Sequence, residues 1–328
     1  MIVPLNPKLF DKDVEQAPIR KGFGEGLLEA GEEDSRVVAL CADLTESTTI
    51  NVFKNRFPER YVEVGIGEQS MASVASGMAA MGKIPFFSSY AMFSPGRNWE
   101  QIRTTIAYNG RNCKIIGSHA GISVGPDGGT HQAIEDMAIT RVIPRMVVIA
   151  PCDMIEAKKA TLAAAKYIGP VYIRLAREAT PIVTSAETPF EIGKAQLFFT
   201  PKEGLAIRVG IIATGSLVYN AIMAAKQLEG EGIGAKVLNL ATVKPLDEEE
   251  VLALATEAGA IVSVEEHQRK GGMGSAVAEF LAQTHPTKQE FIGVDDQFGQ
   301  SGTPSELVEH YGMGIGAIVA AAKKVIAR

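Results

Sequence analysis

Short runs of apolar residues alternate along the chain with longer alanine-rich stretches in which apolar residues recur every three or four positions. The runs VVALCADL, CKIIGS, MVVIAP and VYIRL have the length of buried strands, whereas EQSMASVASGMAAMG and DMIEAKKATLAAA have helical spacing. This alternation is typical of βα units around a mostly parallel sheet. We therefore predict an α/β fold for the first half of the chain.

The alternation stops after Arg177 and resumes near residue 205. The intervening stretch is rich in Pro, Thr and Glu, which favours a linker. Beyond it, RVGIIAT, AKVLNL and AIVSVEE alternate with helical patterns such as LVYNAIMAAKQLEG. The prediction is two α/β domains, at residues 1–187 and 205–328, each with a mostly parallel sheet flanked by helices and joined by a linker at 188–204.

Composition excludes several classes of function. A chain of 328 residues with 46% hydrophobic content can form two cores, and a net charge of -6 provides no basic surface for nucleic acid. The N-terminus lacks the basic start and apolar run of a secretory signal, and no apolar run is long enough to span a bilayer. We expect a cytoplasmic protein that binds neither nucleic acid nor membrane.

The three cysteines, Cys41, Cys113 and Cys152, are far apart and lack metal-ligand spacing, which fits reduced thiols in a cytoplasm. Cys152, in PCD, could serve as a nucleophile. A small buried thiol at the end of a strand is the simpler interpretation.

The glycine-rich stretch SHAGISVGPDGGTHQ, residues 118–132, carries His119, Asp127 and His131. Glycine lets a ligand approach the main chain closely, so this loop can wrap a small polar molecule. The three side chains could be metal ligands, but their spacing fits no metal-binding pattern, and we predict no metal site. Imidazoles and a carboxylate equally suit hydrogen bonds to sugar hydroxyls and proton transfer near neutral pH.

Two further stretches precede this loop. Glu68, in GIGEQ, opens a predicted helix, where a favourable interaction with the helix dipole would by itself explain a carboxylate. In FFSSYAMFSPGRNW, Tyr90, Phe93 and Trp99 lie at and beyond a predicted strand end, where open α/β sheets bind ligands. They could form a stacking surface for a heteroaromatic ring, and core packing is the alternative.

Taken in order, GIGEQSMASVASGMA, SSYAMFSPGRNWEQIR, GSHAGISVGPDGGTHQ and VEEHQRKGGMGSAVAEFLA resemble the pyrimidine-binding and C-terminal domains of transketolase, a thiamine diphosphate enzyme. The resemblance covers nearly the whole chain after the first dozen residues, and SHAG with DGGTHQ is its most specific part. It implies transfer of a two-carbon ketol unit from a ketose phosphate to an aldose phosphate, as in the pentose phosphate pathway.

The resemblance also implies roles for individual residues. Glu68 would hydrogen-bond a ring nitrogen of the cofactor's aminopyrimidine and favour its imino tautomer. Phe93 would stack on that ring with Tyr90 close by, Asp43 would lie near the cofactor and the subunit contact, and the role of Trp99 stays open. With Glu68, the catalytic residues would be His119 and His131.

For the substrate, His131 would contact the hydroxyls beside the reacting carbonyl, and Asp127 the neighbouring hydroxyl. The distal phosphate would be held at four positions, namely Arg20, Ser47, His119 and Arg177. Guanidinium groups suit phosphate, although arginines are usually ordinary surface residues. Arg174 matches the family pattern less well.

The chain has no GDG sequence, with which thiamine diphosphate enzymes anchor Mg and the diphosphate. The resemblance therefore implies a split enzyme, in which an N-terminal transketolase subunit holds the metal and the diphosphate. Two copies of each chain would form the simplest assembly, a heterotetramer. We expect the C-terminal domain to stabilise the assembly without building the active site, and His267 to be structural or at a subunit contact.

Three alternatives remain at this point. The β subunit of the decarboxylating component of 2-oxoacid dehydrogenases has similar length, but its equivalent loop lacks SHAG and DGGTHQ. An enzyme like 1-deoxyxylulose-5-phosphate synthase shares GxxEQ and THQ, but Arg20 and Ser47 look more like transketolase. A non-catalytic paralogue is the third, and the presence of Glu68, His119, Asp127 and His131 argues against it.

Overall fold

Six parallel strands and one antiparallel strand form the larger sheet of the computed structural model, which describes residues 3–328. Its order across the sheet is β12 (Thr242–Lys244), β6 (Val147–Ile149), β7 (Val171–Arg174), β5 (Lys114–Ser118), β4 (Ile84–Tyr90), β2 (Val37–Cys41) and β3 (Tyr61–Glu63). Only β12 runs antiparallel. Strands β2, β5, β6 and β7 are buried throughout, which explains why they are nearly continuous apolar runs in the sequence.

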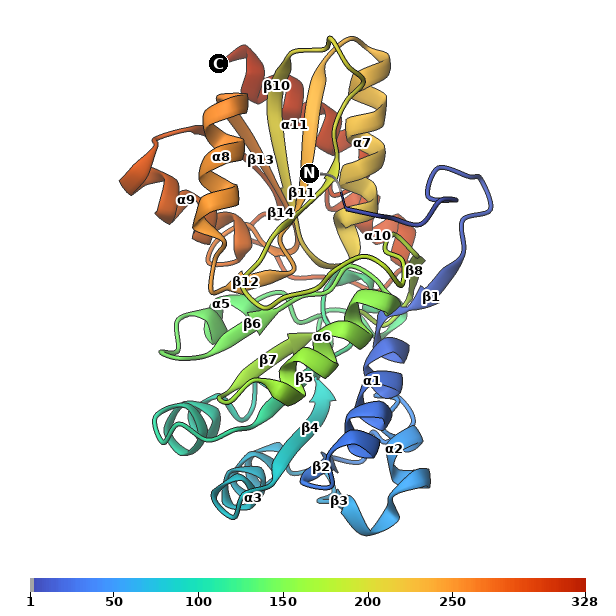
Figure 1. Ribbon diagram of the computed structural model, residues 1–328, viewed down its shortest axis with the longest axis vertical. Coiled ribbons are helices and arrows are strands. Elements are labelled where there is room, and N and C mark those ends of the chain that lie inside the picture. The colour runs from blue at the N-terminus through green and yellow to red at the C-terminus, as the bar shows by residue number, and fades with distance from the viewer. Residues whose placement is uncertain (1–2) are drawn as a thin grey trace.

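Helices cover both faces of this sheet (Figure 1). One face packs against α1 (Ile19–Glu33), α2 (Asn51–Arg56) and α6 (Met154–Lys166). The other packs against α3 (Glu68–Ala80), the α4 and η2 segment (Trp99–Gln101 and Ile102–Ala107) and α5 (Asp136–Arg141). Two short elements, η1 (Pro58–Arg60) and η3 (Ile122–Asp127), lie in the connections.

Helices α1 and α6 pack unusually closely, at two glycines four residues apart. A Cβ atom on Gly22 would lie 1.9 Å from the carbonyl oxygen of Met154, and one on Gly26 would lie 2.8 Å from that of Lys158. Residues at this spacing lie on one face of a helix. The glycines of KGFGEG therefore fix α1, and with it Arg20 in its first turn.

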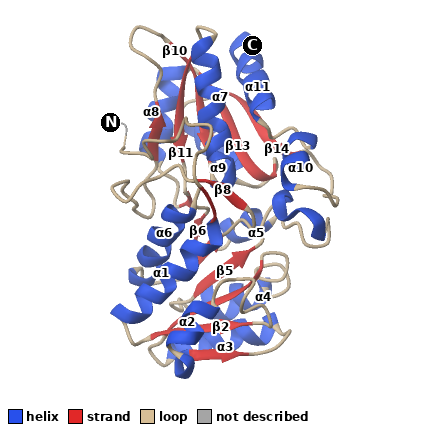
Figure 2. Cartoon of the chain, turned by 90° about the vertical axis from the view of Figure 1, so that its right-hand side faces the viewer, coloured by secondary structure: helices blue, strands red, loops and turns tan. Residues whose placement is uncertain are grey.

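The second sheet has the order β14 (Lys288–Val294), β13 (Ala260–Gln268), β10 (Ile207–Ala213), β11 (Gly234–Asn239) and β9 (Gln196–Phe199). All but β9 are parallel. Its helices are α7 (Val218–Gly230), α8 (Glu248–Ala258), α9 (Met273–Thr284), α10 (Pro304–His310) and α11 (Ile315–Ala327), with η4 (Gly215–Leu217) before α7. The predicted fold class is confirmed: two mostly parallel sheets are flanked by helices, as Figure 2 shows.

Strands cross between the two halves of the chain. Residues 188–204, expected to be a linker, contain β9, which forms an edge of the second sheet. Conversely, β12 lies within 205–328 but pairs with β6 of the first sheet, and β1 (Gln16–Pro18) pairs with β8 (Ala179–Pro181) in a separate ribbon. No helix within residues 3–328 is long and apolar enough to cross a membrane.

Arg174 lies at the junction of the two halves. Its guanidinium binds the carboxylate of Asp136, with Nε 2.9 Å from Oδ2, and donates to the carbonyl oxygen of Glu266. Both charged side chains are almost completely buried. The weak match of Arg174 to a phosphate-binding position thus has a structural explanation, since its donors are used inside the protein.

Candidate active site

The predicted site residues follow the carboxyl ends of five parallel strands, at one edge of the first sheet. They are Asp43 and Ser47 after β2, Glu68 after β3, Tyr90 and Phe93 at and beyond the end of β4, His119 with Asp127 and His131 after β5, and Arg177 after β7. Arg20 reaches the same edge from the start of α1. This is where open α/β sheets place their ligands.

Glu68 is the first residue of α3, and its side chain is only 2% exposed. Ser89 Oγ donates to one carboxylate oxygen at 2.9 Å, and Arg97 Nη1 lies 2.5 Å from the other. Asn98 Nδ2 donates to the main-chain oxygen of Glu68 at 3.1 Å. A buried carboxylate needs hydrogen-bond partners of this kind. The sequence alone does not indicate these roles of Ser89, Arg97 and Asn98.

A cavity of about 190 Å³ opens beside this carboxylate. Its lining consists of Ala42, Asp43, Leu44, Ile66, Glu68, Phe93 and Arg97. Asp43 has a left-handed backbone (φ 58°), and its N–H donates to Glu63 Oε1 at 2.8 Å. Asp43, Glu68 and Phe93, three of the predicted cofactor-binding residues, thus lie around one small cavity.

Four aromatic rings continue from this cavity toward the glycine-rich loop. Tyr90 stacks on His119, with ring centres 3.9 Å apart, and lies nearly parallel to Phe93 at 6.3 Å. His131 meets Phe93 edge to face at 5.5 Å. Trp99 is engaged elsewhere, because its Nε1 donates to the carbonyl oxygen of Ile139 and its ring packs against the core.

Charged groups lie beyond His119. Arg20 donates to the main-chain oxygen of Arg177, and Arg177 Nη1 donates to the carbonyl oxygen of Val124 at 2.7 Å. Asp127 Oδ1 lies 3.7 Å from the Arg177 guanidinium. Burial lowers the pKa of Arg20, and the charge of Arg177 lowers it further.

His119 is buried and has a left-handed backbone (φ 55°). Burial, and then the charges of Arg20 and Arg177, lower its pKa to about 3. The imidazole is therefore neutral at physiological pH, with Nδ1 2.9 Å from Ser118 Oγ. A neutral imidazole beside two guanidinium groups can donate or accept a hydrogen bond without adding charge.

Ser47 lies half-buried in the loop that follows β2. Thr49, in the same loop, donates its hydroxyl to the main-chain oxygen of Arg20 at 2.7 Å. This bond joins the loop to the first turn of α1. The structure therefore places the two predicted phosphate-binding positions, Arg20 and Ser47, in segments that contact each other.

The second half of the chain packs directly on the glycine-rich loop. Gln132 Nε2 donates to the carbonyl oxygens of Ile122 and Gln300, at 2.9 and 3.0 Å. A Cβ atom on Gly129 would lie 2.7 Å from the carbonyl oxygen of Gly299. The 299–300 segment of the C-terminal half therefore supports the loop that carries Asp127 and His131.

His267 and Cys152 are both buried inside the protein. His267 is fully buried, and its Nδ1 lies 2.8 Å from the carbonyl oxygen of Gln268. Cys152 is a buried free thiol just after β6, and burial raises its pKa well above the usual value. Within residues 3–328, no group of three or more His, Cys, Asp or Glu side chains is arranged to hold a metal ion.

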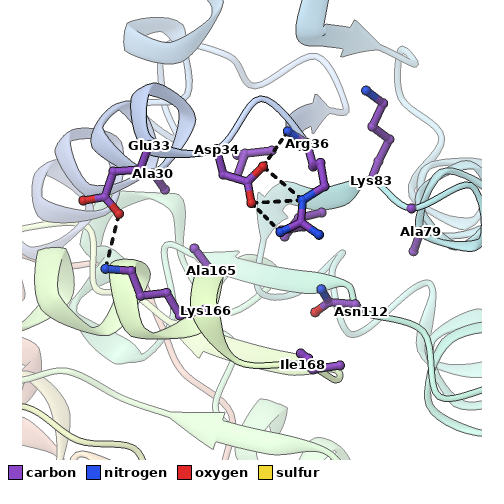
Figure 3. A pocket seen from close by; sticks show the side chains of 13 residues that line it. Ala30, Glu33, Asp34, Arg36, Ala79, Lys83, Asn112, Ala165, Lys166 and Ile168 are labelled. Carbon is purple, nitrogen blue, oxygen red and sulfur yellow. Dashed lines mark hydrogen bonds and ion pairs between the residues drawn. The ribbon is translucent and has the colours of Figure 1, made fainter.

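A second cavity, of about 560 Å³, lies at the opposite edge of the same sheet, where the strands begin (Figure 3). Four of its charged side chains form two ion pairs, and Lys83 is an additional lining residue. Arg36 Nη2 lies 2.7 Å from Asp34 Oδ2, and Lys166 Nζ lies 3.2 Å from Glu33 Oε2. This cavity has no counterpart to the aromatic rings and imidazoles that lie near the Glu68 cavity.

Comparison with known families agrees with the geometry. Residues 15–183 match the family described as "Transketolase, pyrimidine binding domain", and residues 206–318 match "Transketolase, C-terminal domain". The first match alone spans more than half of the chain. The chain belongs to the transketolase family. Within this family it comprises the pyrimidine-binding and C-terminal domains.

Individual relatives have similar lengths. The "Putative transketolase C-terminal section" of Methanocaldococcus jannaschii is 44% identical over 298 residues, covering 90% of this chain and 92% of the relative. The "6-deoxy-6-sulfo-D-fructose transketolase subunit" of a Clostridium species is 41% identical over 319 residues, covering 97% and 98%. A solved structure described as "Split gene transketolase, inactive beta4 tetramer" superposes with a TM-score of 0.87 at 43% identity, covering 94% and 98%.

Proposed function

We propose that this chain is the C-terminal subunit of a split, thiamine diphosphate-dependent transketolase. Together with a partner chain it transfers a two-carbon ketol unit from a ketose phosphate to an aldose phosphate, in the cytoplasm and as a step of the pentose phosphate pathway. The observation that carries this proposal is the buried carboxylate of Glu68 beside the Phe93 ring in one small cavity. Glu68 and Phe93 fit an aminopyrimidine, which needs a hydrogen-bond partner at its edge and an apolar surface at its face.

In this proposal each residue acts on the ring from a fixed position. Glu68 binds a ring nitrogen and holds the proton there, while Ser89 orients the carboxylate through its 2.9 Å hydrogen bond. Phe93 packs on the ring face, Tyr90 extends that aromatic surface, and Asp43 closes the cavity near the subunit contact. When bound, the cofactor supplies the carbon chemistry of ketol transfer.

The substrate lies along the glycine-rich loop. His131 and Asp127 contact the hydroxyls near the reacting carbonyl. His119 and His131 lie against Tyr90 and Phe93, and from there they take part in proton transfer at the substrate. Arg20 and Arg177, with Ser47 and His119, bind the distal phosphate. Burial lowers the pKa of Arg20 and the charge of Arg177 lowers it further, and a bound anion would offset both effects, which supports an anion site here.

A partner chain completes the enzyme. It would be the N-terminal transketolase subunit, holding the diphosphate and Mg, in an assembly of two copies of each chain. Two observations support this: the chain has no GDG sequence, and relatives that match nearly end to end are described as a section or a subunit of transketolase. The related tetramer made of one chain type is described as inactive.

A second substrate class is a sulfonated sugar. The relative that covers 97% of this chain acts on 6-deoxy-6-sulfo-D-fructose, according to its description. Sulfonate and phosphate are both compact oxyanions, so the same guanidinium pair suits either.

The test is a ketol-transfer assay with Mg and thiamine diphosphate, run on this chain alone and on the complex that co-purifies with it from its own cells. We expect activity only in the complex, with a phosphorylated donor used more efficiently than a sulfonated one. Tight cofactor binding and ketol transfer by the single chain would contradict the split-enzyme proposal. Decarboxylation of a 2-oxoacid by the complex would instead place it with the other thiamine enzymes.

A further inference from the structure

We propose that Arg97 occupies the place of the cofactor's aminopyrimidine when the site is empty, and must swing out for the cofactor to bind. This inference rests on the proposed function, since it takes the cavity beside Glu68 to be the pyrimidine site. Arg97 would then set how tightly and how fast the cofactor binds.

The contacts of Arg97 match those that an aminopyrimidine would make. Its Nη1 lies 2.5 Å from Glu68 Oε2, and its guanidinium carbon lies 4.6 Å from the centre of the Phe93 ring. A guanidinium is a planar group whose edge donates N–H bonds and whose face stacks on aromatic rings. Arg97 therefore uses the carboxylate of Glu68 and the face of Phe93, the two features that the proposed ring requires.

The local backbone explains how Arg97 reaches both groups. Its N–H donates to the carbonyl oxygen of Phe93 at 3.0 Å, so the two side chains are one turn apart on the same side. A Cβ atom on Gly96 would lie 1.9 Å from the carbonyl oxygen of Met92, so this turn requires glycine. The FSPGR sequence thus directs Arg97 back toward the cavity.

The side chains of Glu68 and Arg97 differ in how far they are buried. The Glu68 side chain is 2% exposed, whereas that of Arg97 is 44% exposed. Ser89 and Asn98 hold Glu68 in place from the protein side, as described above. Displacement would therefore move Arg97 into solvent and leave Glu68 where it is.

Removing Arg97 should strengthen cofactor binding. In the empty site, Arg97 offsets the cost of a buried carboxylate, and the cofactor must replace that interaction. With Arg97→Met the empty site loses its stabilising cation, whereas the loaded site loses nothing. Because Arg97 is partly solvated, we expect the Kd of thiamine diphosphate to fall by about three- to tenfold and association to become faster.

The experiment uses the assembled complex with excess Mg. Thiamine diphosphate is titrated by calorimetry, and its association rate is followed by stopped-flow fluorescence. The variants are Arg97→Met and Arg97→Lys, with Arg103→Met as a matched control, because Arg103 is an exposed arginine on the helix that follows. Lysine keeps the charge but not the planar group, so the Kd of thiamine diphosphate for Arg97→Lys should lie between the values for wild type and Arg97→Met. The Kd for Arg103→Met should match wild type.

The outcomes separate this inference from the function on which it rests. If the wild-type complex neither binds thiamine diphosphate nor transfers ketol units, the proposed function fails. If the wild-type complex does both, but Arg97→Met and Arg97→Lys bind the cofactor with unchanged or weaker affinity, Arg97 is not a competitor of the ring and the inference is wrong. Circular dichroism of each variant before titration confirms that the fold is retained.

Discussion

The two ends of the first sheet use similar charged residues in different ways. At the amino end, Arg36 pairs with Asp34, and Lys166 pairs with Glu33, in the lining of a solvent-exposed cavity. At the carboxyl end, Arg20 donates to the main-chain oxygen of Arg177, and burial, followed by the charge of Arg177, lowers the pKa of Arg20. The comparison teaches that cavity size is a poor guide to function here. The proposed ligand-binding end differs in that two guanidinium groups, a carboxylate and two imidazoles gather on one loop cluster, next to the small cavity at Glu68.

The largest effect should come from the carboxylate in the cofactor cavity. Glu68→Ala removes the partner of the ring nitrogen, and we expect the kcat of the assembled complex to fall by about 10²- to 10⁴-fold. Glu33→Ala, at the other end of the sheet, is the matched control and should retain wild-type activity. Unchanged turnover in Glu68→Ala would mean that this carboxylate is not catalytic.

The next largest effect on kinetics should come from removing an arginine at the carboxyl end of the first sheet, compared with one at its amino end. Arg177→Met should raise the KM for a phosphorylated donor by about tenfold with little change in kcat, because it removes one phosphate contact made in both ground and transition states. Arg36→Met should leave both constants unchanged, since an exposed ion pair contributes little. Equal effects of the two substitutions would remove the distinction between the ends.

The pH dependence of stability should show the environment of His119. Its native pKa is about 3 and its ordinary value is 6.5, so the unfolded chain binds a proton between these values and the folded chain does not. The contribution of His119 to stability is therefore complete above pH 6.5 and is lost as the pH drops toward 3, at up to about 1.4 kcal/mol per pH unit.

Urea unfolding of this chain at pH 7.5, 6 and 5 measures that slope. His119→Gln should lose stability less steeply than wild type over this range, because glutamine does not titrate. The other titrating groups are common to both proteins, so the difference in slope reports His119. Parallel curves would show that His119 titrates normally in the folded protein.

The smallest effect on catalysis should come from Lys114, a buried residue at the amino end of β5. Its Nζ donates to the carbonyl oxygens of Tyr167 and Gly169 at 2.7 and 2.8 Å. Lys114→Met leaves both without this donor, so we expect a loss of about 1–3 kcal/mol in stability and no change in KM. Thermal unfolding and steady-state kinetics test this, and a raised KM with unchanged stability would contradict it.

The parallel strands could be predicted because buried runs of β-branched residues alternate with helical spacing. The stretch before residue 205 contains only a short strand-like run, and neither the pairing of β9 nor strand β12 could be predicted, since both strands are three or four residues long and pair with strands distant in sequence. Such short edge strands carry little local signal, and their pairing depends on tertiary contacts. The exchange between the two halves was therefore visible only in the structure.

The site likewise contains residues that sequence motifs indicate and residues that only the structure reveals. Glu68, Phe93 and the two histidines of the glycine-rich loop belong to recognisable motifs, and the structure brings them together. Arg97 follows Phe93 in FSPGR, but sequence spacing does not show that its side chain returns to Glu68. Gln132 was missed for a related reason, since one of its bonds reaches residue 300.

The most direct test of the account is a crystal structure of the assembled complex with thiamine diphosphate and Mg bound. We predict the aminopyrimidine on the face of Phe93, with a ring nitrogen within hydrogen-bond distance of the Glu68 carboxylate and Arg97 turned into solvent. An aminopyrimidine bound outside the Glu68 cavity, with the bond between Arg97 and Glu68 intact, would contradict the account.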